Sequence, residues 1–331
     1  SATQAELSIA WGVFAAGLVQ LLFQVPFLAR LKLLPRPKVG FSHPGVKRIL
    51  LLMGPALFGV SVGQINLLLD TVLASLLETG SITWLYLSDR LYELPLGIFA
   101  IAISTVILPS LSRSFSSERS AHFANTLDWG LRLLLLISVP SALALCILAK
   151  PIIATVFYRG ELTAHDVDMA AMSLQAYSLG LVFMMLIKVL APGYYARQDT
   201  KTPVRIGIQA MVVNMVLNLA LVIPFQHAGL ALATSLSAFF NAYMLYRGLK
   251  ATGHYKAQPG WLAFAIKVLI ANAALFVAMY FMMGDAQQWL EWGTWQRIGW
   301  MSAIVGVGVA VYFVTLVVFG LRPKHVKGAK F

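Results

Sequence analysis

Long apolar stretches, separated by short polar loops, dominate the chain. A helix that crosses the ~30 Å hydrocarbon core of a bilayer needs about 20 mostly apolar residues. Measured against that length, the sequence predicts nine membrane-spanning helices: Leu7–Leu28, Ile49–Leu77, Ile82–Leu111, Leu127–Leu148, Met169–Leu190, Ile206–Ile223, Gly229–Leu245, Trp261–Met283 and Ile298–Leu321. No stretch has the apolar–polar alternation of a membrane barrel strand. The sequence therefore predicts an all-α polytopic membrane protein.

The charged residues support this class and predict an orientation. Only 11% of the residues are charged, against roughly a quarter in a soluble domain. The basic residues lie almost entirely in one set of loops, and the opposite set holds only Lys150, Arg159 and Arg297. By the positive-inside rule the basic loops are cytoplasmic, which places the carboxyl end inside and the Ser1 end outside. The net charge of +12 is then a topology signal, and no nucleic-acid partner is expected.

An odd number of spans places the two ends of the chain on opposite sides of the membrane. We interpret the outside Ser1 end as a sign that further helices precede it. The chain is expected to be the carboxyl-terminal part of a larger transporter. A separate amino-terminal fragment is expected to supply the missing helices.

One predicted span carries a charged stripe made of Tyr86, Asp89, Arg90 and Glu93. Ionisable groups in hydrocarbon cost roughly 2.5–3.5 kcal/mol each on insertion scales, so a span that keeps three is expected to use them. Asp89 and Glu93 are four residues apart, as are Tyr86 and Arg90, so the four share one helical face. That face is predicted to line a watery cavity or another polar helix. Arg90 either forms a structural ion pair or binds an anion, and the surplus carboxylate favours anion binding.

A second polar set combines Asp70 in the second span with Asn214, Asn218 and Thr234 in the sixth and seventh. Carboxylate, amide and hydroxyl oxygens suit a hard cation or a proton. The alternative is an interhelical hydrogen-bond network without an ion. No structural metal is expected, because the six histidines lack metal-ligand spacing. The sequence also lacks a nucleophile elbow, an HExxH motif and a P-loop, so no catalytic residues are predicted and the chain is not expected to be an enzyme.

Three segments resemble one family of transporters: Asp89–Arg113, Val156–Asp166 and Tyr194–Ile206. They are similar to the MurJ/MviN lipid II flippases, which belong to the multidrug/oligosaccharidyl-lipid/polysaccharide exporter superfamily. The resemblance runs along the whole chain and implies a multi-pass protein of the inner membrane of an enteric Gram-negative bacterium. Its role would be in peptidoglycan synthesis and hence in cell shape.

The resemblance also implies a domain plan. Family members have about fourteen spans, arranged as two six-helix lobes plus a final pair. Residues 1–30 would be the last helix of the amino-terminal lobe, and residues 31–48 a basic cytoplasmic linker. Residues 49–250 would form the carboxyl-terminal six-helix lobe, and residues 251–331 the extra hairpin and a cytoplasmic tail.

The implied function is to flip lipid II from the cytoplasmic to the periplasmic leaflet by alternating access. By resemblance, Arg90 would contact the pyrophosphate, with Asp89, Glu93 and Tyr86 beside it. The polyprenyl tail would lie in a groove lined by the last hairpin, in contact with membrane lipids. Some relatives are thought to hold sodium near positions that match Asp70, Asn214, Asn218 and Thr234. Asn218 replaces an acid of some relatives, so proton coupling or direct drive by the membrane potential becomes the favoured energy source, and no cofactor is implied.

Three alternatives stay open. The first is a cation-coupled small-molecule or drug antiporter of the same superfamily, and the last hairpin, Trp261–Leu321, argues against it because twelve-span antiporters lack that hairpin. The second is an intramembrane enzyme acting on polyprenyl phosphates, with the outer loop Lys150–Asp168 as its site. The third is a lipid-binding scaffold without transport.

Overall fold

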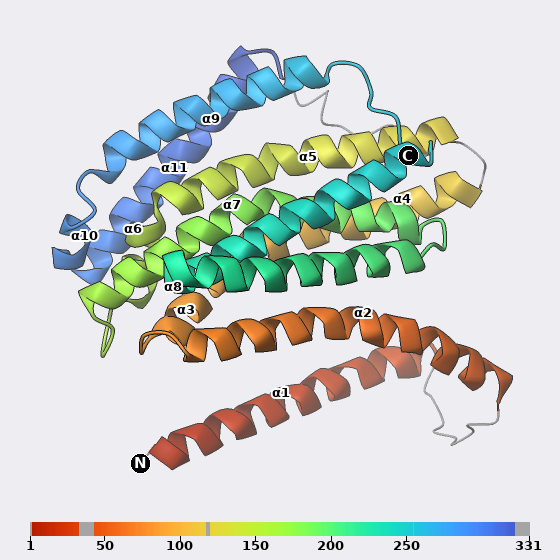
Figure 1. Ribbon diagram of the computed structural model, residues 1–331, viewed down its shortest axis with the longest axis horizontal. Coiled ribbons are helices and arrows are strands. Elements are labelled where there is room, and N and C mark those ends of the chain that lie inside the picture. The colour runs from red at the N-terminus through yellow and green to blue at the C-terminus, as the bar shows by residue number, and fades with distance from the viewer. Residues whose placement is uncertain (1, 33–42, 117–119, 254, 322–331) are drawn as a thin grey trace. The chain divides into compact units, whose positions relative to one another are not determined.

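The computed structural model describes residues 2–32, 43–116, 120–253 and 255–321, and these form helices joined by loops (Figure 1). Most of the predicted linker 31–48, and the tail 322–331, lie outside the described residues. The chain divides into two units, residues 1–54 and 55–331. The first unit contains α1 (Ala2–Arg30), whose large apolar side chains between Leu7 and Phe27 are exposed wherever their placement is described. The second helix, α2 (Pro44–Ser75), starts in the first unit and continues into the second.

The span with the charged stripe is one continuous helix that changes from α-helical to π-helical and back. It consists of α3 (Ser81–Pro95), a five-residue π-helical segment η1 (Leu96–Ala100) and α4 (Ile101–Ser116). Pro95 cannot donate a backbone hydrogen bond and its ring crowds the preceding turn. The wider π turn directly after it is the kind of bulge that often lies at functional sites.

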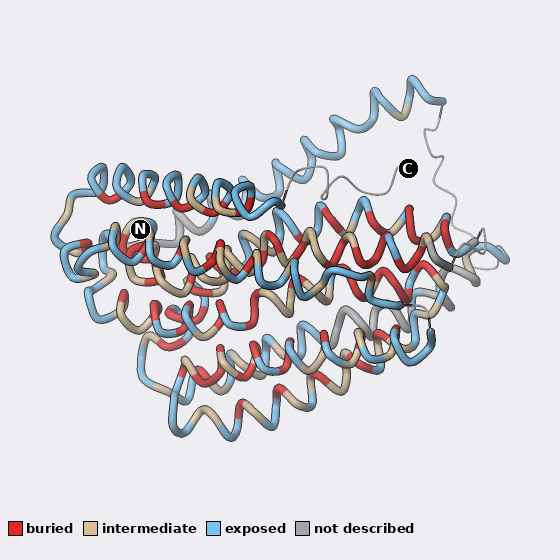
Figure 2. Tube along the Cα trace, turned by 90° about the horizontal axis from the view of Figure 1, so that it is seen from above, coloured by how far each residue is buried: buried red, intermediate tan, exposed pale blue. Residues whose placement is uncertain are grey.

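The centre of the second unit is α7 (Ala164–Tyr195). It packs against α3 and α4, and against α5 (Ser120–Ile147), α6 (Ala149–Phe157) and α8 (Lys201–Ala251). The buried residues lie on the facing sides of these helices, and the residues on the outward sides are exposed (Figure 2). That is the pattern expected where the surrounding solvent is lipid, because exposed apolar side chains then carry no cost.

The 51-residue helix α8 (Lys201–Ala251) is a hairpin of two helices. Gln226 interrupts it with φ 49° and ψ −131°. Asn214 donates to Thr234 at 3.4 Å, although 20 residues of straight helix would separate them by about 30 Å. The two predicted spans Ile206–Ile223 and Gly229–Leu245 are therefore the two limbs of α8, which run back along each other in Figure 1.

The last two long helices form a second hairpin. α9 (Trp261–Met283) has the predicted bounds, and α11 (Thr294–Val318) follows the short α10 (Gln288–Glu291). This hairpin packs on α5 and α6. In the described part of the chain, seven helices are long and apolar enough to cross a membrane. The multi-pass, all-helical class is thus confirmed, whereas the count of nine spans is not.

Candidate functional site

The polar stripe of α3 is present, and Arg90 is its most exposed charged group. The guanidinium Nη1 donates to Glu93 Oε2 at 3.1 Å, and the side chains of Arg90 and Glu93 are 55% and 50% exposed. The Arg90 guanidinium also stacks 4.9 Å above the ring of Tyr86. Both contacts are local to the helix, since the partners lie one turn to either side. They hold the guanidinium against the helix surface while leaving half of it accessible.

Asp89 points to a different place from Arg90. It lines a cavity of about 100 Å³ with Asp70 and Thr71 of α2, Tyr86, and Tyr177 of α7. No ion pair joins Asp89 to Arg90 among the described residues. The structure thus brings two carboxylates, Asp70 and Asp89, to one cavity, and leaves the cation on the outer side of α3.

The second predicted set is brought together completely. Asn218 Nδ2 donates to Asp70 Oδ1 at 2.6 Å and to Asn214 Oδ1 at 3.0 Å. Asn214 Nδ2 donates to Thr234 Oγ1 at 3.4 Å, and the Thr234 hydroxyl donates to Leu230 O at 3.1 Å. The four side chains form one continuous hydrogen-bonded chain that joins α2 to both limbs of α8.

The Asn218 amide is at the centre of this hydrogen-bonded chain, because its Nδ2 donates to both Asp70 and Asn214. Asn214 and Asn218 are both fully buried. Asn218 Oδ1 is buried without a hydrogen-bond partner among the described residues, so a half-turn of the amide would present an oxygen where an NH₂ now donates. The oxygens of Asp70, Asn214 and Thr234 fit a hard cation chemically, but one carboxylate gives such a site little charge.

The outer loop that the enzyme alternative needs is occupied by structural contacts. Lys150 pairs with Asp168 at 2.6 Å. Asp166 accepts from the backbone and hydroxyl of Thr163, as part of the capping box of α7, and from Trp84 Nε1 at 2.7 Å. Asp166 caps a helix and binds a tryptophan, and Asp168 pairs with a lysine, so these two acids do not converge on a reacting centre.

The sequence reasoning missed two buried charged residues. Asp128, in the first part of α5, is 3% exposed, and Arg297, placed in a loop by the sequence, is a buried residue of α11 at 6%. An Asp–Arg pair four residues apart, Asp128 and Arg132, at the start of an apolar span was the available signal for the first. Nothing in the sequence around Arg297 signals its burial.

Comparison with known proteins identifies relatives along the chain. A family model described as "Lipid II flippase MurJ" matches residues 1–295. The "Probable lipid II flippase MurJ" of Vibrio cholerae is 52% identical over 98% of this chain and 62% of its own length. The protein of the same description from Haemophilus influenzae is 49% identical over 97% of this chain and 64% of its own length. The chain thus spans under two thirds of the length of these relatives.

Solved structures share the fold. One described as "Lipid II flippase MurJ, inward closed conformation" superposes with a TM-score of 0.71 at 24% identity, over 88% of this chain and 59% of the other. An outward-facing multidrug resistance MATE family transporter of the MOP superfamily gives a TM-score of 0.52 at 16% identity, over 79% of this chain and 62% of the other. The matches give no support for a separate amino-terminal fragment, and the predicted enteric origin stays a prediction.

Proposed function

The chain belongs to the lipid II flippase MurJ family, and on that premise we propose that it takes part in moving lipid II from the cytoplasmic to the periplasmic leaflet of the bacterial inner membrane. Lipid II is then its substrate, and transport rather than chemical conversion is its activity. The carboxyl end faces the cytoplasm and the Ser1 end the periplasm, in keeping with the basic loops.

The observation that carries the proposal is the exposed Arg90 inside a membrane span. A charge in a span is expensive unless it meets water or a partner. Glu93 takes one N–H of the guanidinium and Tyr86 is a second hydrogen-bond partner, but a guanidinium has five N–H donors and the side chain is 55% exposed, so donors remain for another acceptor. Planar guanidinium groups bind phosphate oxygens through paired, charge-assisted hydrogen bonds. Arg90 therefore binds the diphosphate of the substrate, and Tyr86 and Glu93 orient it.

We infer a separate role for the hydrogen-bonded chain that begins at Asp70. Asp70 and Asp89 line one cavity, so protonation of either relieves the repulsion between them. This arrangement supports coupling to protons more than to sodium. Asp70 is the one carboxylate among the four hydrogen-bonded side chains, and the Asn218 amide already bridges Asp70 Oδ1 and Asn214 Oδ1. An inside-negative membrane potential adds ~2.3 kcal/mol per charge and 100 mV to the outward movement of an anionic lipid.

The terminal hairpin favours a lipid-linked substrate over a small drug. α9 and α11 add an apolar surface beside the lobe, and family members with this hairpin are matched over 97–98% of this chain. A groove along the hairpin would keep the polyprenyl tail in lipid while the head group crosses. The structural likeness to the MATE transporter shows a common fold and does not favour drug export.

The test is lipid II export by variants of the intact protein in cells whose own flippase can be depleted. Arg90→Ala is expected to abolish export, because the diphosphate loses its cation, and Arg90→Lys to retain only part of it. Asp89→Ala is expected to reduce export as well. Arg159→Ala, an exposed loop arginine, is the matched control and should export normally. Wild-type export by well-expressed Arg90→Ala and Asp89→Ala variants would refute the site.

A further inference from the structure

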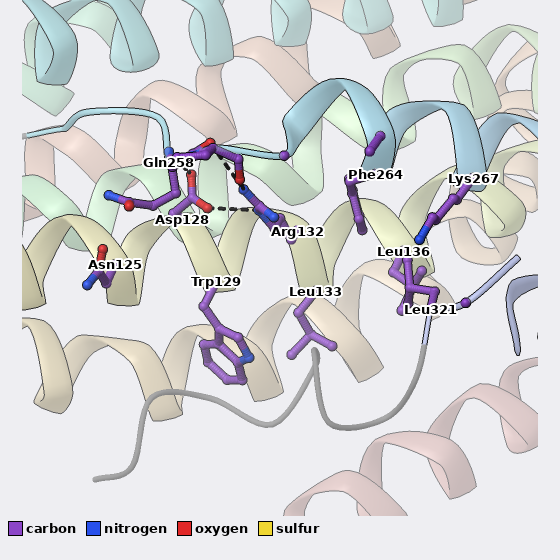
Figure 3. A pocket seen from close by; sticks show the side chains of 14 residues that line it. Asn125, Asp128, Trp129, Arg132, Leu133, Leu136, Gln258, Phe264, Lys267 and Leu321 are labelled. Carbon is purple, nitrogen blue, oxygen red and sulfur yellow. Dashed lines mark hydrogen bonds and ion pairs between the residues drawn. The ribbon is translucent and has the colours of Figure 1, made fainter.

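A second cavity, of about 440 Å³, lies between the first half of α5, the start of α9 and the end of α11 (Figure 3). Its lining includes three charged side chains, Asp128, Arg132 and Lys267, and the indole of Trp129. None of its lining residues belongs to the stripe of α3 or to the hydrogen-bonded chain of Asp70. By the predicted topology these helix ends lie on the cytoplasmic side.

Asp128 is saturated by its neighbours. Its Oδ1 accepts from Tyr255 Oη at 2.8 Å, from Trp261 Nε1 at 2.7 Å and from the backbone of Gln258 at 3.2 Å. Its Oδ2 pairs with Arg132 Nε at 2.8 Å. Burial, followed by the nearby Asp128 carboxylate, raises the pKa of Tyr255 above its usual value, so the phenol stays protonated and keeps donating. The negative charge in the cavity is therefore already neutralised.

The positive charge in the cavity is only partly balanced by the described acidic groups. Arg132 Nη2 donates hydrogen bonds to the carbonyls of Pro259 and Gln258, at 2.9 and 3.3 Å. Its Nη1 donates to none of the described residues. Lys267 is half-buried and has no hydrogen-bond or ion-pair partner in the described part of the chain. Its Nζ lies near Gly320, at the end of α11. The helix end offsets at most about half a unit of charge, so the cavity keeps a net positive charge.

We propose that this cavity binds the phosphate group of an anionic glycerophospholipid, with Lys267 as the main contact and Arg132 Nη1 as the second. A cavity of about 440 Å³ is far larger than a phosphate. The apolar wall formed by Leu133, Leu136 and Phe264 suits the glycerol and the first acyl carbons. Gly260 starts α9 without a side-chain cap, so backbone N–H groups at the cavity rim add to the anion preference.

The experiment compares lipid binding to variants of the intact protein in detergent by native mass spectrometry. Phosphatidylglycerol, which is anionic, is the probe. Phosphatidylcholine has a phosphate but no net charge, so it tests whether net charge matters. Glycerol 1-phosphate has no acyl chains, so it tests whether a soluble phosphate is sufficient. Phosphatidylglycerol is expected to bind tightest, and Lys267→Gln to weaken it about fivefold, the effect of one basic side chain near a membrane surface. Lys267→Arg should restore binding. Lys188→Gln, an exposed lysine of another span outside the cavity, should leave it unchanged.

Equal weakening by Lys188→Gln and Lys267→Gln would overturn the proposal, as would equal binding of the two phospholipids. Glycerol 1-phosphate binding as tightly as phosphatidylglycerol would overturn the lipid assignment. Arg132 is left intact in these variants, because it also holds Asp128 and the loop before α9, and its loss would confuse binding with folding.

Discussion

At the residue scale, the two neighbours Asp89 and Arg90 do different things. Successive residues of an α-helix point about 100° apart. A four-residue stripe therefore has edges, and Asp89 lies on the edge that faces α2 and α7, whereas Arg90 lies on the outer edge. Spacing alone predicted the common face, whereas the Asp70 set was predicted from the polar chemistry of residues within apolar spans. It could not predict which neighbour each edge meets, because that depends on the packing of helices distant in sequence.

The Asn218 amide decides whether the buried chain needs a cation, and the change Asn218→Asp tests this. The new carboxylate cannot donate to Asp70 or Asn214, so a buried acid would face the half-buried Asp70 at a cost of about 3–5 kcal/mol. We expect the unfolding midpoint of the variant to fall in choline chloride and to recover in sodium chloride. Wild type should respond equally to both salts. The matched control is Asn272→Asp, because Asn272 is buried in α9, where its partners are Val268 O and Tyr312 and no described carboxylate pairs with it. Equal sodium rescue of both variants would contradict the idea.

At the scale of elements, apolar length predicted most helices but not every interruption within them. α9 agrees with its prediction at both ends because Gly260 and Gly284, both with positive φ, delimit it. α6 was not predicted, since a nine-residue helix is too short to be recognised by a span-length criterion. The π segment after Pro95 is equally invisible to hydropathy, because it arises from local backbone geometry. The kink at Gln226, by contrast, lies in the gap between the predicted spans Ile206–Ile223 and Gly229–Leu245, so this interruption was predicted.

Close approach between α7 and α8 depends on Gly180. A Cβ at this position would lie 2.6 Å from Ser235 Cα and 2.5 Å from its Oγ, which donates to Ala176 O. Gly180→Ala is therefore expected to destabilise the protein by about 1–3 kcal/mol, because two helix backbones must separate. Gly207→Ala in α8, where a Cβ meets nothing within 4 Å, is the control and should gain about 0.5–1 kcal/mol. Thermal unfolding in detergent measures both, and equal midpoints would show that the helices can separate without cost.

At the scale of the whole second unit, the terminal hairpin is tied to the lobe at three levels. The Asp128 network holds the loop before α9, and Tyr312 of α11 donates to Leu136 O of α5 at 2.8 Å. At the other end, Arg297 donates to Ala154 O at 3.0 Å and Leu290 O at 3.0 Å. A hairpin held at both ends and in the middle would follow its lobe as one body in the proposed transport cycle.

Two single substitutions test the contacts at the two ends of the hairpin independently. Asp128→Ala removes the acceptor for Tyr255 and Trp261, and Arg297→Gln leaves buried carbonyls of α6 without their donor. Each loss is expected to cost about 2 kcal/mol locally, which corresponds to roughly thirtyfold faster amide exchange. Hydrogen exchange should therefore rise near residues 255–262 in the first variant and near residues 288–297 in the second, so each variant is the control for the other. If either change loosened both ends equally, the hairpin would be held by a single cooperative contact surface, and its two ends could not be released one at a time.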